Sequence, residues 1–172
     1  MADLDIGLLI LRLVVGLTFA VHGAQKVFGW WSGPGMTGWT GAMHKMGFQP
    51  AGAFAVISAG AELVGGLALA LGLLTPLAGM VLVGQSVVII GKAHLPQGFF
   101  NSKGGYEYPL ALAGGVAAIT LAGPGSISLD STLGVALTGV APVVLVLIGI
   151  VGGLASLALS SMSTRQTVAT QR

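Results

Sequence analysis

Long runs of apolar residues, separated by shorter polar segments, dominate the pattern of the chain. A membrane-spanning helix needs about 20 mostly apolar residues, and five stretches approach that length. They are 6–28, 51–74, 77–93, 106–121 and 133–159. The third and fourth are short for a span, and the fifth contains no charged residue. The pattern therefore predicts an all-α protein with five transmembrane helices.

The connections between these stretches alternate between short and long. The turns at 75–76 and 123–125, the second of which leads to Asp130, are short and should lie on one side of the membrane. The two long connections carry most of the polar residues. Pro142 falls inside the fifth stretch, where we expect it to kink the helix because proline removes a backbone hydrogen bond.

The first long connection predicts a short helix of its own. Its apolar residues recur at spacings of three and four, as on one face of a helix, and they are Met36, Trp39, Met43 and Met46. Gly47 and Pro50 should end this helix, which we expect to lie in the membrane interface. We interpret Trp30, Trp31 and Trp39 as interface anchors rather than as a cofactor site.

Composition excludes several classes of protein. Only 7 Lys and Arg and 5 Asp and Glu occur in 172 residues, whereas about 25% of the residues of a soluble domain are charged. The 29 glycines indicate closely packed helices in a membrane. No cysteine is present, which excludes attached haem and cysteine-ligated iron–sulfur clusters. No basic cluster suggests nucleic-acid binding. The acidic N-terminus predicts a retained helix rather than a secretory signal.

The distribution of basic residues predicts an orientation. One side of the membrane receives Lys26, Lys45, Lys92, Lys103, Arg165 and Arg172. The other side receives none of them, unless Arg12 reaches it. The positive-inside rule then places the N-terminus outside, and both long loops and the C-terminus in the cytoplasm.

Two charges lie at membrane depth, where burial is expensive unless the charge is paired. Arg12 is in the first stretch and Glu62 is near the middle of the second. Because the two helices run antiparallel, we estimate that their depths differ by only about 6 Å. We therefore predict an ion pair between them, with either a catalytic role or that of a buried strut between helices.

A polar stripe on the first helix predicts a cavity. At about 100° per residue, Arg12, His22 and Lys26 share a face with small residues, as Glu62 does on the second helix. Gln85 would close this interior. We predict that one cavity, open toward the long loops, collects Arg12, His22, Lys26, Glu62, His94, Glu107 and Tyr108.

Three alternatives remain open for this cavity. A quinone headgroup suits it, because His22 and Lys26 could donate to a carbonyl, Glu107 could relay protons, and Trp30 or Trp39 could cover the mouth. A polar cluster that merely joins the helices is the second reading. A metal site is disfavoured, because the histidines and the glutamate match no metal-binding spacing.

Several segments, in this order and spacing, resemble the DoxX family of bacterial membrane proteins. They are Leu-Arg-Leu at 11–13, His-Gly-Ala-Gln-Lys at 22–26, Ala-Glu-Leu-Val-Gly-Gly at 61–66, Gly-Leu-Leu-Thr-Pro at 72–76, Gly-Gly-Tyr-Glu-Tyr-Pro at 104–109, Gly-Pro-Gly at 123–125 and Ser-Leu-Asp at 128–130. The resemblance covers about residues 7–130. It matches the family at Arg12, His22, Lys26, Glu62, Glu107 and Asp130.

The resemblance implies a polytopic membrane four-helix bundle core, related to the membrane subunit of thiosulfate:quinone oxidoreductases. Family members are linked to respiratory quinol oxidation and redox defence. We accordingly predict a DoxX-like domain at 1–130, an additional fifth transmembrane helix at 131–160 and a polar tail at 161–172.

Two functions follow as hypotheses. The first is a quinone-linked redox protein, or a subunit of a membrane oxidoreductase complex, in the bacterial inner membrane. Its electrons would come from a soluble redox partner or other subunits. The alternative is a structural or assembly subunit without its own catalysis. A transporter is disfavoured, because no inverted repeat is evident.

Overall fold

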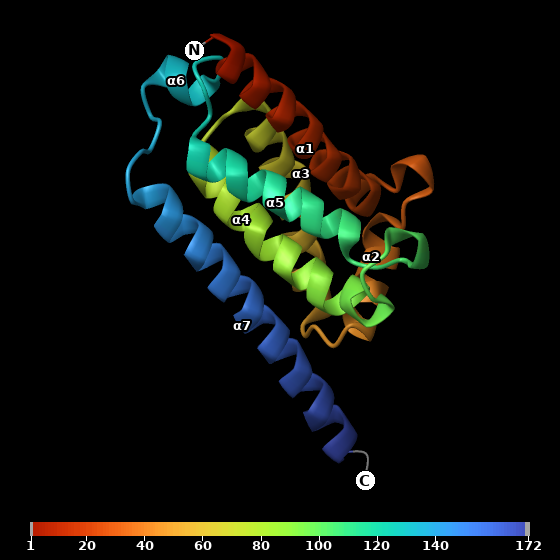
Figure 1. Cartoon of the computed structure of the whole chain (residues 1–172). Coiled ribbons are helices and arrows are strands. Elements are labelled where there is room, and N and C mark those ends of the chain that lie inside the picture. Colours follow the sequence, from red (N-terminus) through yellow and green to blue (C-terminus); the bar gives the residue numbers. More distant parts are fainter. Residues whose placement is uncertain (1, 171–172) are drawn as a thin grey trace.

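Long helices lie side by side in the computed structural model, which describes the backbone of residues 2–170 and the side chains of residues 3–162 (Figure 1). The helices are α1 (Ala2–Phe28), α2 (Gly35–Lys45), α3 (Ala51–Leu71), α4 (Thr75–Ile89), α5 (Glu107–Ala122), α6 (Leu129–Leu133) and α7 (Ala141–Thr170). A π-helical segment, Ile90–His94, extends α4, and short 3-10 turns occupy Trp30–Ser32, Leu95–Gln97 and Asn101–Lys103. No strand occurs within residues 2–170, which confirms the all-α prediction.

Four helical segments are long and apolar enough to cross a membrane. They are Asp3–Phe28, Ala51–Leu71, Thr75–Gln97 and Ala141–Met162. The helix α5 has 16 residues, which correspond to about 24 Å at 1.5 Å per residue, against about 30 Å of hydrocarbon. The described chain is thus that of a multi-pass membrane protein with four candidate spans, and α5 is shorter than the five-span prediction requires.

Glycines bring α1 and α3 into backbone contact. A Cβ atom added to Gly66 would lie 2.5 Å from the backbone nitrogen of Ala20, and one added to Gly16 would lie 2.6 Å from that of Ala70. No side chain fits at such distances, so small residues at these positions allow the helices to touch. These contacts also determine which residues of the two helices lie at the same depth.

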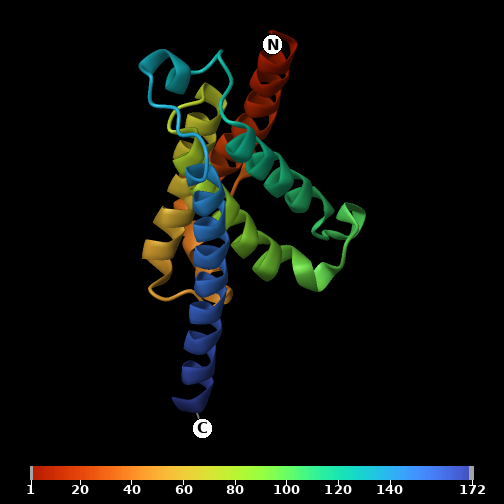
Figure 2. The same cartoon turned by 60° about the vertical axis from the view of Figure 1, so that its left-hand side comes forward.

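A second crossing of this kind joins α7 to α4. A Cβ atom on Gly84 would lie 2.9 Å from the carbonyl oxygen of Gly149, and one on Gly153 would lie 2.7 Å from that of Gly84. Beyond this crossing α7 continues past the end of the other helices (Figure 2). Pro142 does not kink α7, because the helix begins at Ala141 and proline is tolerated in a first turn. The predicted kink is therefore wrong.

The two short turns meet at the N-terminal end of the bundle, near α6 (Figure 1). The carboxylate of Asp130 accepts hydrogen bonds from the backbone nitrogens of Leu74 and Thr75, at 2.6 and 2.8 Å. The backbone nitrogen of Asp130 donates to the carbonyl of Gly72 at 2.8 Å. This contact confirms that both short turns lie on one side.

The predicted loop helix is present as α2. Its buried Met43 packs with Phe48 and Ala55 at the start of α3, and Met36, Trp39 and Met46 lie against the same cluster. The apolar face of α2 therefore contacts the bundle. Placement of α2 in the membrane interface stays a prediction.

Candidate functional site

A cavity of about 290 Å³ lies at the end of the bundle that carries α2 and the long loops. Its apolar lining comprises Phe19, Met43, Met46, Val88, Ile89, Ala93, Pro109 and Leu112, and its polar lining comprises His22, Lys26, Trp39, Glu62, Gln85, Ser86, His94 and Tyr108. Helices α1 to α5 all contribute residues. Five of the seven predicted site residues therefore share one cavity.

An ion pair between Lys26 of α1 and Glu62 of α3 forms the polar floor of the cavity. The Lys26 Nζ donates to Glu62 Oε1, and the side chains are 13% and 1% exposed. The amide nitrogen of Gln85 in α4 donates to the same oxygen at 3.0 Å. Three helices thus converge on one carboxylate oxygen, which offsets the desolvation of both charges.

Trp39 holds α2 over this pair. Its indole Nε1 donates to the hydroxyl of Ser58 in α3 at 2.7 Å. The Lys26 Nζ lies 4.1 Å from the centroid of the Trp39 ring, a distance at which the ring attracts the cation. Lys26 is therefore held between a carboxylate and an aromatic face, and α2 is tied to α3 directly above the ion pair.

The second oxygen of Glu62 is different. Within the described residues, no group donates a hydrogen bond to Oε2, although the atom is buried. Burial of a charged oxygen without a donor is expensive. Glu62 thus has one carboxylate oxygen without a hydrogen-bond donor among the described residues, and its side chain lines the cavity.

Two histidines line the cavity, and in each of them one ring nitrogen is hydrogen-bonded to a backbone carbonyl. His22 Nδ1 lies 2.8 Å from the carbonyl of Thr18, and His94 Nδ1 lies 2.7 Å from that of Gly104. A carbonyl only accepts, so Nδ1 carries the proton in both rings and Nε2 is an acceptor when the ring is neutral. His94 is placed by the π segment Ile90–His94, a distortion that often occurs at functional sites.

Arg12 lies at the opposite end of the bundle, and the predicted ion pair between Arg12 and Glu62 is wrong. The Arg12 Nη2 donates to the carbonyl of Ile127, and Asp130 is the nearby counter-charge. Arg12 is 1% exposed, and its Nε and Nη1 find no hydrogen-bond partner among the described residues. It belongs to the polar contacts that join the two short turns.

The helix register explains this error. Glu62 lies beside Leu63, against which Gly23 of α1 packs, whereas the Arg12 guanidinium lies against Gly72. From Arg12 to Gly23 is about 11 residues, or about 16 Å along α1. An arginine side chain does not span that distance, and Lys26 is the cation that lies at the depth of Glu62.

Glu107 is also outside the cavity. Its Oε2 accepts a hydrogen bond from the backbone nitrogen of Asn101 at 2.9 Å, and the residue is exposed. This carboxylate closes the loop that precedes α5. Its neighbour Tyr108 does reach the cavity, with its ring centroid 6.5 Å from that of His22.

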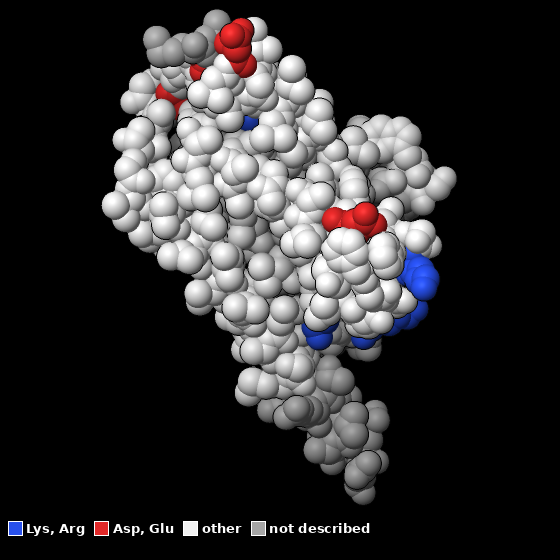
Figure 3. All heavy atoms as spheres, in the orientation of Figure 1, with Lys and Arg blue, Asp and Glu red and all other residues white. Residues whose placement is uncertain are grey.

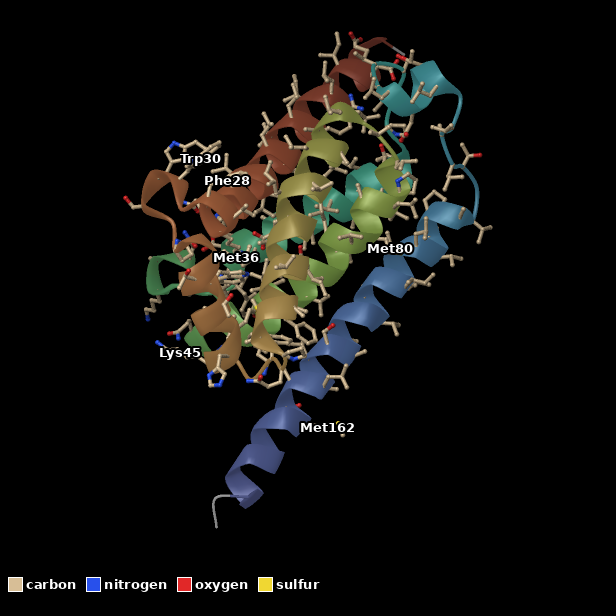
Figure 4. All side chains as sticks on the ribbon, turned by 180° about the vertical axis from the view of Figure 1, so that it is seen from behind. Phe28, Trp30, Met36, Lys45, Met80 and Met162 are labelled. Atoms are coloured by element: carbon tan, nitrogen blue, oxygen red, sulfur yellow. The ribbon has the colours of Figure 1, made fainter. Side chains whose placement is uncertain are left out.

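Of the other aromatic and histidine residues considered in the sequence, some line the cavity and others lie outside it. Trp30 and Phe28 stack at 4.7 Å and project from the bundle (Figure 4), and Trp31 is likewise exposed. Only Trp39 of the three tryptophans lines the cavity. His44 is exposed on α2. In the described part of the chain, no three His, Asp or Glu side chains are close enough to hold a metal ion.

Three features of the site were not predicted from the sequence. Met43 and Met46 line the cavity, although their spacing only marks a helix face. The Trp39 to Ser58 hydrogen bond joins residues from two helices, and no pattern in the sequence indicates it. The turn from α-helical to π-helical backbone at Ile90 has no sequence signal that we can identify.

Comparison with known proteins identifies a family. The family model described as DoxX matches residues 7–95, which include α1 from Gly7 onward, α2 to α4 and the π segment. No curated protein and no solved structure matches the chain. The matched residues contain the ion pair, Gln85, Trp39 and both flanking histidines.

Proposed function

This chain belongs to the DoxX family, and on that premise we propose that it is a quinone-linked membrane redox protein or the quinone-binding subunit of a membrane oxidoreductase complex. One observation carries the proposal. A buried ion pair with a free carboxylate oxygen lies in a cavity whose other walls are mainly apolar. Small-molecule sites are typically apolar chambers with a few convergent polar groups.

The donor set suits a ring with oxygen at opposite edges. Lys26 and Gln85 supply N–H donors that a carbonyl oxygen could accept. Glu62 Oε2 could accept a hydroxyl, and His22 Nε2 could accept another. Phe19 of α1 and Leu112 of α5 provide apolar surface for the ring. The residues therefore fit both the oxidised and the reduced form of such a ligand.

A bound quinone would supply the two-electron chemistry that the protein's own side chains lack. Lys26, Glu62 and His22 would bind its oxygens and hold protons at the cavity floor. The aromatic ring of Trp39 and the methionines of α2 would exclude water from the loop side. Electrons would come from a soluble redox partner or another subunit, because the chain contains no cysteine.

The membrane arrangement is part of the proposal. We infer that α5 completes a five-span bundle in a bacterial inner membrane, with the N-terminus outside and the C-terminus in the cytoplasm. On the face drawn in Figure 3, acidic side chains lie at the N-terminal end, and basic ones gather at the loop end beside one acidic patch, with a largely uncharged belt between. Lys45 projects from the loop end (Figure 4). The positive-inside rule then favours a cytoplasmic loop end.

A second function, assembly of other membrane subunits, is favoured by α7. Its contacts within the chain are mainly with α4, through the glycine crossing described above. On its outer side Leu147, Val151 and Leu154 are 55%, 65% and 55% exposed. An apolar helix face of this kind can pack against lipid or against another subunit.

Photolabelling tests the redox proposal. Purified protein would be irradiated with an azido-quinone, and the labelled peptides identified by mass spectrometry. We expect label on cavity residues of α1, α3 or α5, and competition by unlabelled quinone. Gln85→Leu should weaken quinone binding by roughly tenfold, or about 1.4 kcal/mol. The substitution removes a hydrogen-bond donor from the cavity, and it removes the hydrogen bond that Gln85 donates to the Glu62 carboxylate.

Gln97→Leu is the matched control, since Gln97 is exposed in the loop and does not line the cavity. It should bind as the unmodified protein does. Label confined to the outer face of α7, together with a stoichiometric co-purifying protein and no quinone, would instead support the assembly function.

A further inference from the structure

A second hollow lies on the outer surface of α1, and it touches the cavity. It is a shallow depression that is wide open to the outside, and it is formed by residues of α1 between Leu13 and His22 together with Tyr108 of α5. His22 and Tyr108 line both hollows. The two spaces are therefore separated by little more than this pair of side chains, whose ring centroids are 6.5 Å apart.

This outer groove lies at lipid depth. Its residues fall in the middle of the candidate span Asp3–Phe28, and from Leu13 to Val21 it extends about 12 Å along the helix. Val14, Leu17 and Val21 are 59%, 46% and 41% exposed. The hydroxyl of Thr18, also in the groove, is engaged with the carbonyl of Val14 at 2.7 Å, so the wall presents little free polarity.

The α2 side of the cavity is closed by packing. Met43 and Phe48 are 3% and 2% exposed, and they pack against Ala55 where α2 meets α3. Trp39 is hydrogen-bonded to Ser58 above the ion pair. A ligand arriving past α2 would have to break these contacts, whereas on the α1–α5 side His22 and Tyr108, which line both hollows, are exposed.

We propose that the cavity is loaded sideways from the lipid, between α1 and α5, and that its ligand carries an apolar tail that stays in the groove along Leu13 to Val21. The inference rests on the quinone-binding function proposed above, and it adds the class of ligand and the route. The head group passes His22 and Tyr108 to reach Lys26 and Glu62. The tail remains in the groove because an apolar chain is disfavoured in the polar cavity and packs against the apolar side chains of α1.

His22 is suited to the threshold between the two spaces. Its Nδ1 is engaged with the Thr18 carbonyl, which holds the ring on α1. Its Nε2 is then an acceptor at the boundary between an apolar groove and a polar chamber. A head group with a hydroxyl finds its first hydrogen-bond partner there, and its next at Glu62 Oε2.

The test compares ligands that differ only in their tail. Binding of decyl-ubiquinone and of the same ring without the decyl chain would be measured to protein in lipid nanodiscs. Val14→Trp fills the groove with a bulky side chain but leaves the cavity lining unchanged. We expect it to weaken binding of the tailed ligand by about tenfold or more, and to leave binding of the tailless ring unchanged.

Val64→Trp is the matched control. Val64 is 66% exposed on α3 and lines neither hollow, so the same replacement adds the same lipid-facing bulk elsewhere. Because both variants are measured with the same ligand, partition of that ligand into the lipid affects the two measurements equally. Unchanged binding of the tailless ring shows that Val14→Trp is folded. If Val14→Trp does not fold, Leu17→Trp makes the same test from the next turn.

The possible outcomes distinguish failure of lateral loading from failure of the proposed quinone-binding function. Equal binding of the tailed ligand by Val14→Trp and Val64→Trp overturns lateral loading, while the quinone site stands. Failure of the unmodified protein to bind either ring overturns the quinone function, and the inference with it. A loss specific to the tailed ligand in Val14→Trp supports both.

Discussion

At the scale of single residues, the membrane interior holds two buried cations that are stabilised differently. Lys26 has a carboxylate and an aromatic ring within contact distance, and a second donor shares the same Glu62 oxygen. Arg12 has one backbone carbonyl and the nearby charge of Asp130. The first arrangement lies in a cavity and the second in a packed end of the bundle. Their replacement should therefore have different consequences.

Replacing both members of the Lys26–Glu62 pair should destabilise the protein less than the two single replacements added together. Lys26→Met or Glu62→Gln alone should cost about 3 kcal/mol, because each leaves a buried partner uncompensated. The double variant should lose less than the two single losses added. Thermal melting in mild detergent measures all three, with Lys45→Met, at an exposed position on α2, expected to melt unchanged. Strictly additive losses would argue against a direct pair.

Arg12→Met should lower the melting temperature without changing ligand binding. The substitution removes the donor to the Ile127 carbonyl and the counter-charge of buried Asp130, at the end of the bundle remote from the cavity. Loss of one partner of a buried charge typically costs about 3 kcal/mol. The check is a melt paired with a quinone-binding measurement on the same sample. A large loss of quinone binding with an unchanged melting temperature would contradict this prediction and would indicate that Arg12 belongs to the binding site.

At the scale of elements, two glycine crossings organise the bundle. In a membrane, helices associate by close packing rather than by burial of apolar surface from water. The α1–α3 crossing brings Lys26 and Glu62 to one depth, and the α4–α7 crossing attaches the last helix. The geometry of the cavity therefore depends on residues that do not line it, such as Gly16 and Gly66.

Gly66→Ala should destabilise the protein, whereas Gly60→Ala in the same helix should not. A Cβ atom at Gly66 meets the backbone of α1 at 2.5 Å, while one at Gly60 meets nothing within 4 Å. We expect a loss of about 1–3 kcal/mol for the first, from forced separation of α1 and α3. The second should gain up to about 1 kcal/mol from helix propensity. Equal melting temperatures for the two variants would contradict a backbone contact at this crossing.

At the scale of the whole molecule, the described ends of the chain lie at opposite ends of the bundle (Figures 1 and 2). Polar contacts around Asp130 close the N-terminal end, and the cavity and long loops occupy the other. In the five-span arrangement proposed above, α5 is one of the spans, and an odd number of spans places the two ends on opposite sides of the membrane.

Reporter fusions test this arrangement. A green fluorescent protein fused to the C-terminus should fluoresce, and alkaline phosphatase fused there should be inactive, because both report a cytoplasmic end. Alkaline phosphatase inserted in the turn between Gly123 and Pro124 should be active, since that turn lies at the N-terminal end. Activity of phosphatase at the C-terminus would overturn the orientation. The same reporter behaviour at the C-terminus and at 123–124 would remove α7 from the set of spans, because α7 is the long apolar helix between the two sites.

The sequence by itself determined where apolar helices form and which face of each is polar. These properties are local, because hydropathy and a 100° period depend only on neighbouring residues. That is why the helices, the loop helix α2, and the grouping of His22, Lys26, Glu62 and Gln85 could be predicted. The family resemblance also came from local segments, and a match over residues 7–95 supports it.

The tertiary structure decided which charge meets which. Apolar stretches do not mark how far one helix is shifted along another, since that shift depends on contacts such as Gly23 with Leu63 and Gly66 with Ala20. About 21 Å along α1 separates the predicted partner of Glu62, Arg12, from the observed one, Lys26. The same dependence on contacts between distant segments left the Trp39 to Ser58 bond and the groove beside His22 beyond sequence reasoning. Helix positions follow from local chemistry, but helix register follows from the packing of surfaces that only the folded chain brings together.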